Sequence, residues 1–191
     1  MKMQLKKDIN SNLITIKNLI NLNEEINSAI SLIYKTIKNG NKIYICGNGG
    51  SAGEAQHFAA EFLVRLNPKK NRKAYPIISL AMDTSTLTAC GNDFNFKYIF
   101  SRNLEALGTK KDLLIVLSTS GNSQNIIEVL KAAKKKKISS LSLLGFDGGK
   151  AKKFSNLNLV VDSNNVARIQ EAHLFLGHFI LNEVEKKLLS K

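Results

Sequence analysis

The sequence predicts an α/β fold, in which a doubly wound, five-stranded parallel sheet is flanked by helices and carries an added N-terminal helical layer. Three observations predict it: short apolar runs alternate with helical stretches, these runs are apolar throughout, and the first 40 residues are helical. Strands buried on both faces are typical of parallel sheets with right-handed crossovers. We expect the flavodoxin-like strand order 2-1-3-4-5 and one domain over 1–191, with N-terminal helices over 1–40 and an α/β core with a C-terminal helix over 41–191.

The first 40 residues predict two helices. Their apolar side chains recur at steps of three and four, which places them in one stripe along the helix surface. The run 21–25 supplies a cap and two acids for a second helix start, and Asn39 and Gly40 end it. The stripe is more than one layer on a sheet needs, so we expect part of it to pack against another chain. It consists of Leu5, Ile9, Leu13, Ile16, Ile20, Ile26, Ile30, Ile33 and Ile37.

The rest of the chain alternates between the two kinds of element. Strands are expected at 42–46, 77–80, 113–117, 139–144 and 157–161. Helices are expected at 52–66, 83–107 with a break near 91–93, 123–136, 148–154 and 165–189.

Composition and charge exclude several classes of protein. A hydrophobic fraction of 43% with 23% charged residues excludes a disordered or fibrous chain. No apolar run approaches the roughly 20 residues of a membrane span, no signal peptide is expected, and two cysteines make no disulfide framework, so we expect a cytoplasmic protein. The net charge of +13 makes nucleic acid a partner to consider. Only four of the 28 basic residues are arginine and the lysines are scattered, which favours a solvated surface that attracts a small anion.

Two loops that follow strands predict anion sites, although glycine and serine are also common in ordinary turns. The first strand leads into glycines at 47–50, and Ser51 with Glu54 has the pattern of a capping box at a helix start. The third strand leads into a hydroxyl-rich loop at 118–123, again before a helix. Free N–H groups at helix starts attract phosphates. In the expected strand order both loops lie at the switch point where ligands bind, which indicates a phosphorylated ligand.

Nucleotide-binding motifs fit these loops less well. The run 47–52 matches the loose dinucleotide pattern G-x-G-x-x-G/A, but no acidic residue follows at the required distance, and Asp83 lies too far along the chain. The run 145–151 resembles a P-loop only in its glycines and lysine, because its spacing is short and the final Ser or Thr is missing. We therefore expect neither a dinucleotide nor a P-loop site.

Three histidines are candidates for chemistry, at His57, His173 and His178. His57 and Glu61 lie four residues apart in an expected helix, so they share one face and can share a metal ion or a proton, or form only a surface pair. Spacing does not choose between His173 and His178, since either can be a core histidine with one hydrogen bond. Gln170 and His178 are separated by about 12 Å of helix rise. Both reach one ion only with extended side chains or from different subunits.

Six motifs follow one another along nearly the whole chain. They lie at 47–52, 55–61, 87–89 with Asn92 and Asp93, 118–123, 145–149, and 168–171 with His178. In this combination and order they resemble the phosphoheptose isomerase family of the sugar isomerase (SIS) superfamily. The Ser-Thr-Ser-Gly loop alone would indicate only the superfamily.

The resemblance implies a zinc-dependent cytoplasmic homotetramer with one zinc ion per subunit and active sites between subunits. It implies conversion of a phosphorylated seven-carbon sugar, sedoheptulose 7-phosphate, to D-glycero-D-manno-heptose 7-phosphate. That is the first step toward nucleotide-activated heptose for lipopolysaccharide core or capsule, and neither nucleic acid nor a membrane is an expected partner. The implied metal ligands are His57, Glu61, Gln170 and His178. The implied substrate-binding residues are Asn48, Gly49, Gly50, Ser51, Glu61, Asn92, Asp93, Ser118, Thr119, Ser120, Ser123 and Gln170.

The implied reaction moves a carbonyl from C2 to C1 of the sugar. It needs a proton removed from C1 and delivered to C2, and a second proton moved between the two oxygens. We expect Glu61 to take the C–H proton and His178 to serve the oxygens as acid, beside a Lewis-acidic metal. The alternative is a non-catalytic SIS module of the initiator-associating type, which senses a sugar phosphate or binds a protein. The presence of all four implied ligands favours the enzyme.

Overall fold

The computed structural model describes residues 1–190 as one sheet covered by helices on both faces. The strands are β1 (Ile43–Gly47), β2 (Ile77–Ser79), β3 (Leu113–Ser118), β4 (Ser139–Gly145) and β5 (Leu157–Val161). The α-helices are α1 (Lys2–Asn18), α2 (Asn23–Lys38), α3 (Gly50–Leu63), α4 (Thr84–Asp93), α5 (Ser101–Leu107), α6 (Gln124–Lys136) and α7 (Val166–Leu189). Short 3₁₀ turns lie at η1 (Leu19–Leu22), η2 (Phe96–Tyr98) and η3 (Ala151–Lys153).

The strand order is β2-β1-β3-β4-β5 with every neighbouring pair parallel, which confirms the expected topology and fold class. Every residue of β1 and β3 is buried, as expected of strands covered on both faces. In register, Ile43 of β1 pairs with Leu113 of β3, and Gly47 pairs with Leu117. The carboxyl ends of β1 and β3 therefore lie side by side, at the position where a doubly wound sheet binds its ligands.

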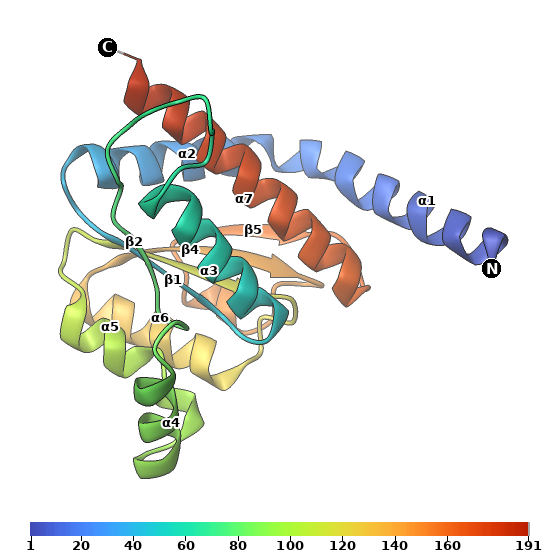
Figure 1. The fold of residues 1–191 in the computed structure, drawn as a ribbon. Helices are drawn as coiled ribbons and strands as arrows, with labels where there is room; N and C mark the ends of the chain where they lie inside the picture. Colours follow the sequence, from blue (N-terminus) through green and yellow to red (C-terminus); the bar gives the residue numbers. More distant parts are fainter. Residues whose placement is uncertain (191) are drawn as a thin grey trace.

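Two hydrophobic clusters fill the two faces of the sheet. One lies beneath α2, α3 and α7, and the other beneath α5 and α6 (Figure 1). Alternate residues of a strand serve the two clusters, as Ile43 and Tyr44 of β1 do. The longest helix, α7, packs against both α2 and α3 and thus spans the first face. Its N-cap, Asn165, accepts hydrogen bonds from the N–H groups of Ala167 and Arg168.

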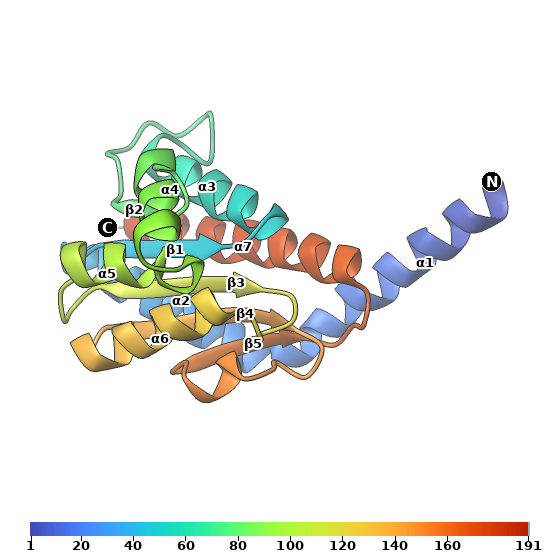
Figure 2. The ribbon, with the colours of Figure 1, turned by 90° about the horizontal axis from the view of Figure 1, so that it is seen from below.

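The N-terminal layer divides into a buried and an exposed part. The two expected helices are present, and the apolar positions of α2 are buried in the first cluster. Helix α1 instead extends away from the sheet in both ribbon views (Figure 1, Figure 2). Leu5, Ile9 and Leu13 are about half exposed or more, and Ile20 after the helix is 74% exposed. Half of the apolar stripe therefore has no cover among the described residues.

Two of the expected helices differ from those observed. The helix expected at 148–154 is only the turn η3, because Gly148 and Gly149 both have positive φ (87° and 54°), outside the right-handed helical region. The expected break in 83–107 lies a few residues later, between α4 and η2. There Asn95 is extended, with φ −173°, and its side chain accepts a hydrogen bond from the N–H of Lys97. Within residues 1–190, no helix combines the length and apolarity of a membrane span.

Candidate active site

The two loops predicted to bind an anion are joined by side chains. Asn48 follows β1, and Asn125 lies in the first turn of α6 after β3. Each amide donates to the other, at 2.9 Å from Asn48 Nδ2 to Asn125 Oδ1 and 2.7 Å from Asn125 Nδ2 to Asn48 Oδ1. This paired bridge holds the two loops at fixed separation. Asn125 is buried and was not among the predicted site residues, because nothing in the sequence distinguishes it from any polar residue in a helical first turn.

The first loop enters α3 through a glycine rather than a capping serine. Gly49 occupies the N-cap position with φ 54°, and no side chain caps this helix end, so the predicted capping box of Ser51 and Glu54 is wrong. Ser51 is buried against the backbone of Gly47. A Cβ atom added to Gly47 would overlap Ser51. The N–H groups of Ser51, Ala52 and Gly53 donate to the carbonyls of Asn48 and Gly49, which leaves those of Gly49 and Gly50 for an anion at this helix start. No side chain caps this end, and an anion site here stays a prediction.

Glu54 also lies in this first stretch of α3. Its Oε2 atom is buried without a hydrogen-bond partner among the described residues. Burial raises the pKa of the Glu54 carboxyl to about 7. With a pKa of about 7, the Glu54 carboxyl is partly protonated near neutral pH, and it is not the reciprocal partner of a capping serine.

The second loop is braced by its own hydroxyl groups and by the loop after β4. The Oγ atom of Ser118 accepts from the N–H of Gly121 at 3.1 Å, and the carbonyl of Thr119 accepts from the N–H of Gly145. Gly121 has φ 61°, and a Cβ at this position would overlap the carbonyl of Gly148. The glycines at 145–149 thus serve to support the hydroxyl loop. Ser123 is the N-cap of α6 and Ser120 is half-buried, so both lie where the N-terminus of α6 meets the loop.

Helices α3 and α7 run in the same direction and touch near both ends of the site. Gly50, at the start of α3, faces the side-chain amide of Gln170, which a Cβ at Gly50 would overlap. About two turns further along each helix, the ring of Phe58 lies against Gly177. Gln170 is therefore beside the first anion loop, while His57 and His178 lie about 10 Å of helix rise beyond it.

Three predicted ligands converge at this second contact. The Nε2 atoms of His57 and His178 are 2.8 Å apart, and His57 Nε2 lies 3.5 Å from Glu61 Oε1. One ligand atom from each of the three residues lies within 4.8 Å of the others. Nitrogen and carboxylate donors at such separations match the preferences of Zn²⁺, whose bonds to them are about 2.0–2.2 Å long. His57 is exposed, and the other two side chains are half-buried, so the cluster is open to a substrate.

The structure separates the two histidines of α7 that spacing left open. His173 is fully buried, and its Nε2 lies 3.1 Å from the carbonyl oxygen of Leu144. Burial lowers the pKa of His173 to about 4. His173 is thus a neutral core residue, whereas His178 faces His57 on the adjoining helix.

Asn92 and Asp93 lie apart from these contacts, at the exposed end of α4. The Asn92 amide donates to the Asp93 carboxylate at 2.8 Å. Figure 1 shows α4 projecting beyond the face that carries α5 and α6, whereas α3 and α7 cover the opposite face of the sheet. A substrate-binding role for these two residues stays a prediction.

Comparisons with known proteins agree on one family. The family model described as the SIS domain matches residues 10–145. A phosphoheptose isomerase from Campylobacter concisus (strain 13826) is 46% identical over 186 residues, which cover 97% of this chain and 97% of that protein. The structure is similar to a phosphoheptose isomerase from Francisella tularensis, with a TM-score of 0.91, 31% identity, and coverage of 96% of this chain and 97% of that one. A phosphoheptose isomerase from Neisseria gonorrhoeae gives a TM-score of 0.90 and 35% identity over 97% of this chain and 98% of that one.

Proposed function

The chain belongs to the SIS domain family and, within it, to the phosphoheptose isomerases, and we propose that it converts sedoheptulose 7-phosphate to D-glycero-D-manno-heptose 7-phosphate. The single observation that carries this proposal beyond family membership is the convergence of His57, Glu61 and His178, two to three helical turns beyond the start of α3. An isomerase that moves a proton between adjacent carbons requires acid and base groups at one end of a phosphate-anchored substrate.

The phosphate of the substrate binds where the two loops meet. The N–H groups at the starts of α3 and α6, together with the hydroxyl groups of Ser118, Thr119, Ser120 and Ser123, supply donors suited to a dianionic phosphoryl group. Asn48 and Gln170 border the same loop. An extended seven-carbon chain leading away from this phosphate runs along α3 and α7 and brings C1 and C2 toward Glu61 and His178.

The metal centre consists of His57, Glu61 and His178, with Gln170 as the fourth ligand that the family resemblance implies. The cluster of nitrogen and oxygen donors supports Zn²⁺, one ion per subunit. A zinc ion held there supplies Lewis-acid polarisation of the sugar carbonyl. The Gln170 amide of the same chain lies against Gly50, and helix rise separates Gln170 from His178 by about 12 Å, which favours Gln170 of a neighbouring subunit as the fourth ligand.

The protein side chains carry the protons. The Glu61 carboxylate removes the proton from C1 and delivers it to C2, and the His178 imidazole moves the second proton between O1 and O2. Ligation lowers the basicity of a carboxylate, so Glu61 acts as ligand and as base in different states of the cycle. His57, whose ring nitrogen lies 2.8 Å from that of His178, fixes the position of the acid.

The proposal includes a cytoplasmic, single-domain protein that assembles as a homotetramer with active sites between subunits. The exposed apolar side chains of α1 support assembly, since closed symmetric oligomers bury such surfaces. The product is a precursor of nucleotide-activated heptose for lipopolysaccharide core or capsule.

The decisive experiment incubates purified, zinc-loaded protein with sedoheptulose 7-phosphate in D₂O and follows the sugar by NMR. We expect the aldose to form with deuterium at C2, because the base exchanges its proton with solvent. Full transfer of the C1 hydrogen to C2 would exclude Glu61 as an exchanging base and indicate a hydride shift.

The alternative of a non-catalytic SIS module predicts binding without turnover. Such a module would bind sugar phosphate at the two loops but would form no aldose, even after loading with zinc. The convergence of His57, Glu61 and His178 favours the enzyme, since binding a phosphate alone does not require this cluster.

A further inference from the structure

The contact between α3 and α7 depends on one residue without a side chain. Gly177 lies in the middle of α7, within the buried face of that helix. A Cβ atom built on Gly177 would overlap three ring atoms of Phe58, namely Cζ, Cε1 and Cε2. Alanine favours a helix interior over glycine, so helix propensity gives no reason for glycine here. The close approach of the Phe58 ring explains why glycine stands at this position.

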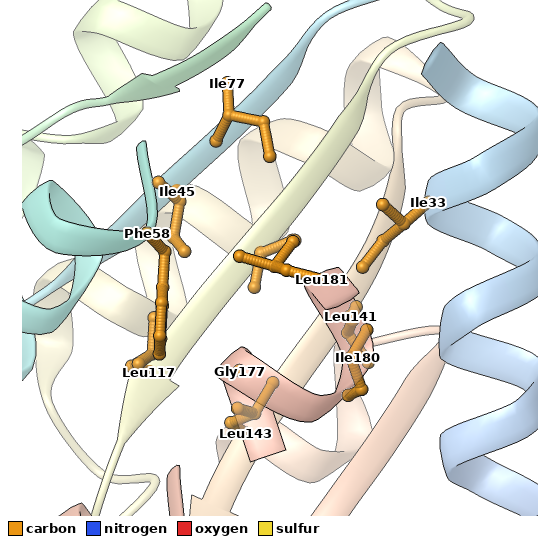
Figure 3. Close-up of a pocket in the computed structure, with 11 residues that line it drawn as sticks. Ile33, Ile45, Phe58, Ile77, Leu117, Leu141, Leu143, Gly177, Ile180 and Leu181 are labelled. Atoms are coloured by element: carbon orange, nitrogen blue, oxygen red, sulfur yellow. The ribbon is translucent and has the colours of Figure 1, made fainter. Parts of the chain in front are cut away.

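The Phe58 ring has no room to move away. It is 3% exposed and lines an apolar cavity of about 30 Å³ together with residues from four strands, from α2 and from α7 (Figure 3). Engineered cavities that admit a benzene ring are about 150 Å³. The cavity is too small to accept a whole displaced phenyl ring, so the ring can shift only slightly, and we expect an added methyl group at Gly177 to push the two helices apart.

The residues that flank this contact are two of the proposed metal ligands. His57 precedes Phe58 on α3, and His178 follows Gly177 on α7. The Phe58 and His178 rings meet edge to face at 5.9 Å between centroids, and the two histidine rings do so at 5.0 Å. The distance between the helix backbones at Phe58 and Gly177 therefore sets the distance between the two imidazole nitrogens.

We infer that Gly177 is a positioning residue of the metal centre: as a spacer without a side chain, it lets α7 approach the Phe58 ring so closely that His57 and His178 lie at ligating distance. This inference rests on the metal site in the proposed function and adds to it the packing that determines its geometry. Neither Gly177 nor Phe58 donates an atom to the metal or to the substrate. Outer-shell groups that orient metal ligands through hydrogen bonds change metal affinity by about 10–100-fold when mutated, and we expect a change in the spacing of the ligands to have an effect of the same order.

The test measures Zn²⁺ affinity by competition with a chromophoric chelator, without substrate, in four variants of the full chain. Gly177→Ala should bind Zn²⁺ at least about tenfold more weakly than wild type. Phe58→Leu removes the three ring atoms that the new methyl group would strike, and should bind Zn²⁺ nearly as wild type does. The double variant Phe58→Leu/Gly177→Ala should then recover most of the affinity that Gly177→Ala loses. Gly53→Ala is the matched control, since it makes the same change within α3 where nothing lies within 4 Å of the added atom.

The outcomes separate this inference from the proposed function. If wild type fails to bind Zn²⁺, the metal centre and the spacer are both overturned. If wild type binds and Gly177→Ala binds equally well, the spacer alone is overturned. An equal loss of affinity in the single and double variants, with circular dichroism unchanged, would also overturn it, because relief of the overlap would then have no effect. If Gly177→Ala does not fold, the folded double variant carries the test, and zinc affinity near that of Phe58→Leu supports the spacer.

Discussion

Glu61 is the proposed base of the reaction and one of the proposed metal ligands. It lies one helical turn after His57, and its carboxylate oxygen is 3.5 Å from the ring nitrogen of that residue. The residue is half-buried, so a substrate carbon can approach it while bulk water is partly excluded. On the opposite side, its main-chain carbonyl is held by Arg72. This contact fixes the main chain from which the carboxylate extends.

Glu61→Gln should lower turnover by about 10²–10⁴-fold, because an amide cannot accept the C–H proton. The isosteric amide should leave the fold unchanged, as judged by circular dichroism and thermal unfolding. Steady-state rates with sedoheptulose 7-phosphate provide the measurement. Glu183→Gln is the control, since Glu183 makes only a surface pair with Lys186. Wild-type turnover in Glu61→Gln would remove this residue as the base.

His173 illustrates how burial separates two residues that look alike in the sequence. His173 and His178 lie five residues apart on the same helix, and spacing alone left either as a candidate ligand. Only the three-dimensional packing shows that His173 has no exposed surface and approaches the carbonyl of Leu144. The Nδ1 atom is buried without a hydrogen-bond partner among the described residues, which disfavours the doubly protonated ring.

Acidification should destabilise the protein through His173. Its pKa falls from 6.5 in the unfolded chain to about 4 in the fold, so between these values the unfolded state binds more protons. The stabilisation is complete above pH 6.5 and is lost as the pH falls through 4, by about 3 kcal/mol in total. Urea unfolding at pH 7 and pH 4 measures it.

The variant His173→Gln isolates this effect, since its amide does not titrate and can still donate to Leu144. Glu54, whose pKa is raised to about 7, shifts stability in the opposite direction but does so equally in both proteins. The free energy of unfolding should therefore fall less steeply with acid in His173→Gln. Parallel pH dependences in the two proteins would contradict a buried neutral His173.

Helix α3 is fixed at its C-terminal end by a buried ion pair. Arg72 contacts Glu185 of α7 at 2.8 Å, with side-chain exposures of 1% and 0%. The same guanidinium donates to the carbonyls of Glu61 and Phe62, which end the helix. It also stacks 4.6 Å from the ring centroid of Tyr75. One side chain thus joins the helix that carries His57 and Glu61 to the helix that carries His178.

Arg72→Met should lower the free energy of unfolding by about 3–5 kcal/mol, because it leaves the Glu185 carboxylate buried without a counter-charge. Adding Glu185→Leu should restore much of the loss, since replacing both members of a buried pair with apolar groups is often close to neutral. Chemical denaturation of both variants measures this difference. Lys186→Met, which breaks an exposed pair, should cost less than about 1 kcal/mol. A double variant no more stable than Arg72→Met would contradict the buried-charge explanation.

Apolar periodicity predicted which helices and strands exist better than it predicted the residues at which they begin and end. All five strands and the long helices lie close to the ranges expected from apolar spacing, because burial on a sheet requires that spacing. The errors lie where backbone conformation decides. Gly49 rather than Ser51 is the N-cap of α3, and positive φ values at Gly148 and Gly149 prevent a helix there. A sequence does not state which glycine adopts a left-handed conformation.

For the whole molecule, strand order and the meeting of the two loops followed from topology rules and were confirmed. The approach of α3 to α7 was not predictable, since the contact between Phe58 and Gly177 depends on packing between segments far apart in the sequence. The spacing of residues along the sequence also does not predict where Asn92 and Asp93 lie relative to the two loops. Sites shared between subunits depend on geometry that no single sequence pattern encodes.

The direction of α1 is fixed by polar contacts, although its apolar side chains are uncovered. Asn12 donates to Glu171 at 2.6 Å, and the Arg168 guanidinium donates to the carbonyl of Asp8 at 2.8 Å. Residues of the motif at 168–171 therefore hold α1 against the start of α7. An anchored helix with an apolar stripe facing solvent is suited to burial by a second copy of the chain.

Replacing Leu5, Ile9 and Leu13 together by glutamine should dissociate the proposed tetramer while leaving the fold of each chain intact. These side chains are 49% to 61% exposed, so the isolated chain loses little by the change, whereas an interface loses its apolar contacts. Light scattering measures the mass, and circular dichroism the fold. If the active sites lie between subunits, turnover should fall with the mass and should recover as the protein concentration rises. Lys7→Gln with Asn10→Gln is the control, because it changes neighbouring polar positions of α1. A variant that stays tetrameric would place the interface elsewhere, and a wild-type monomer with full turnover would show that each chain builds its own site.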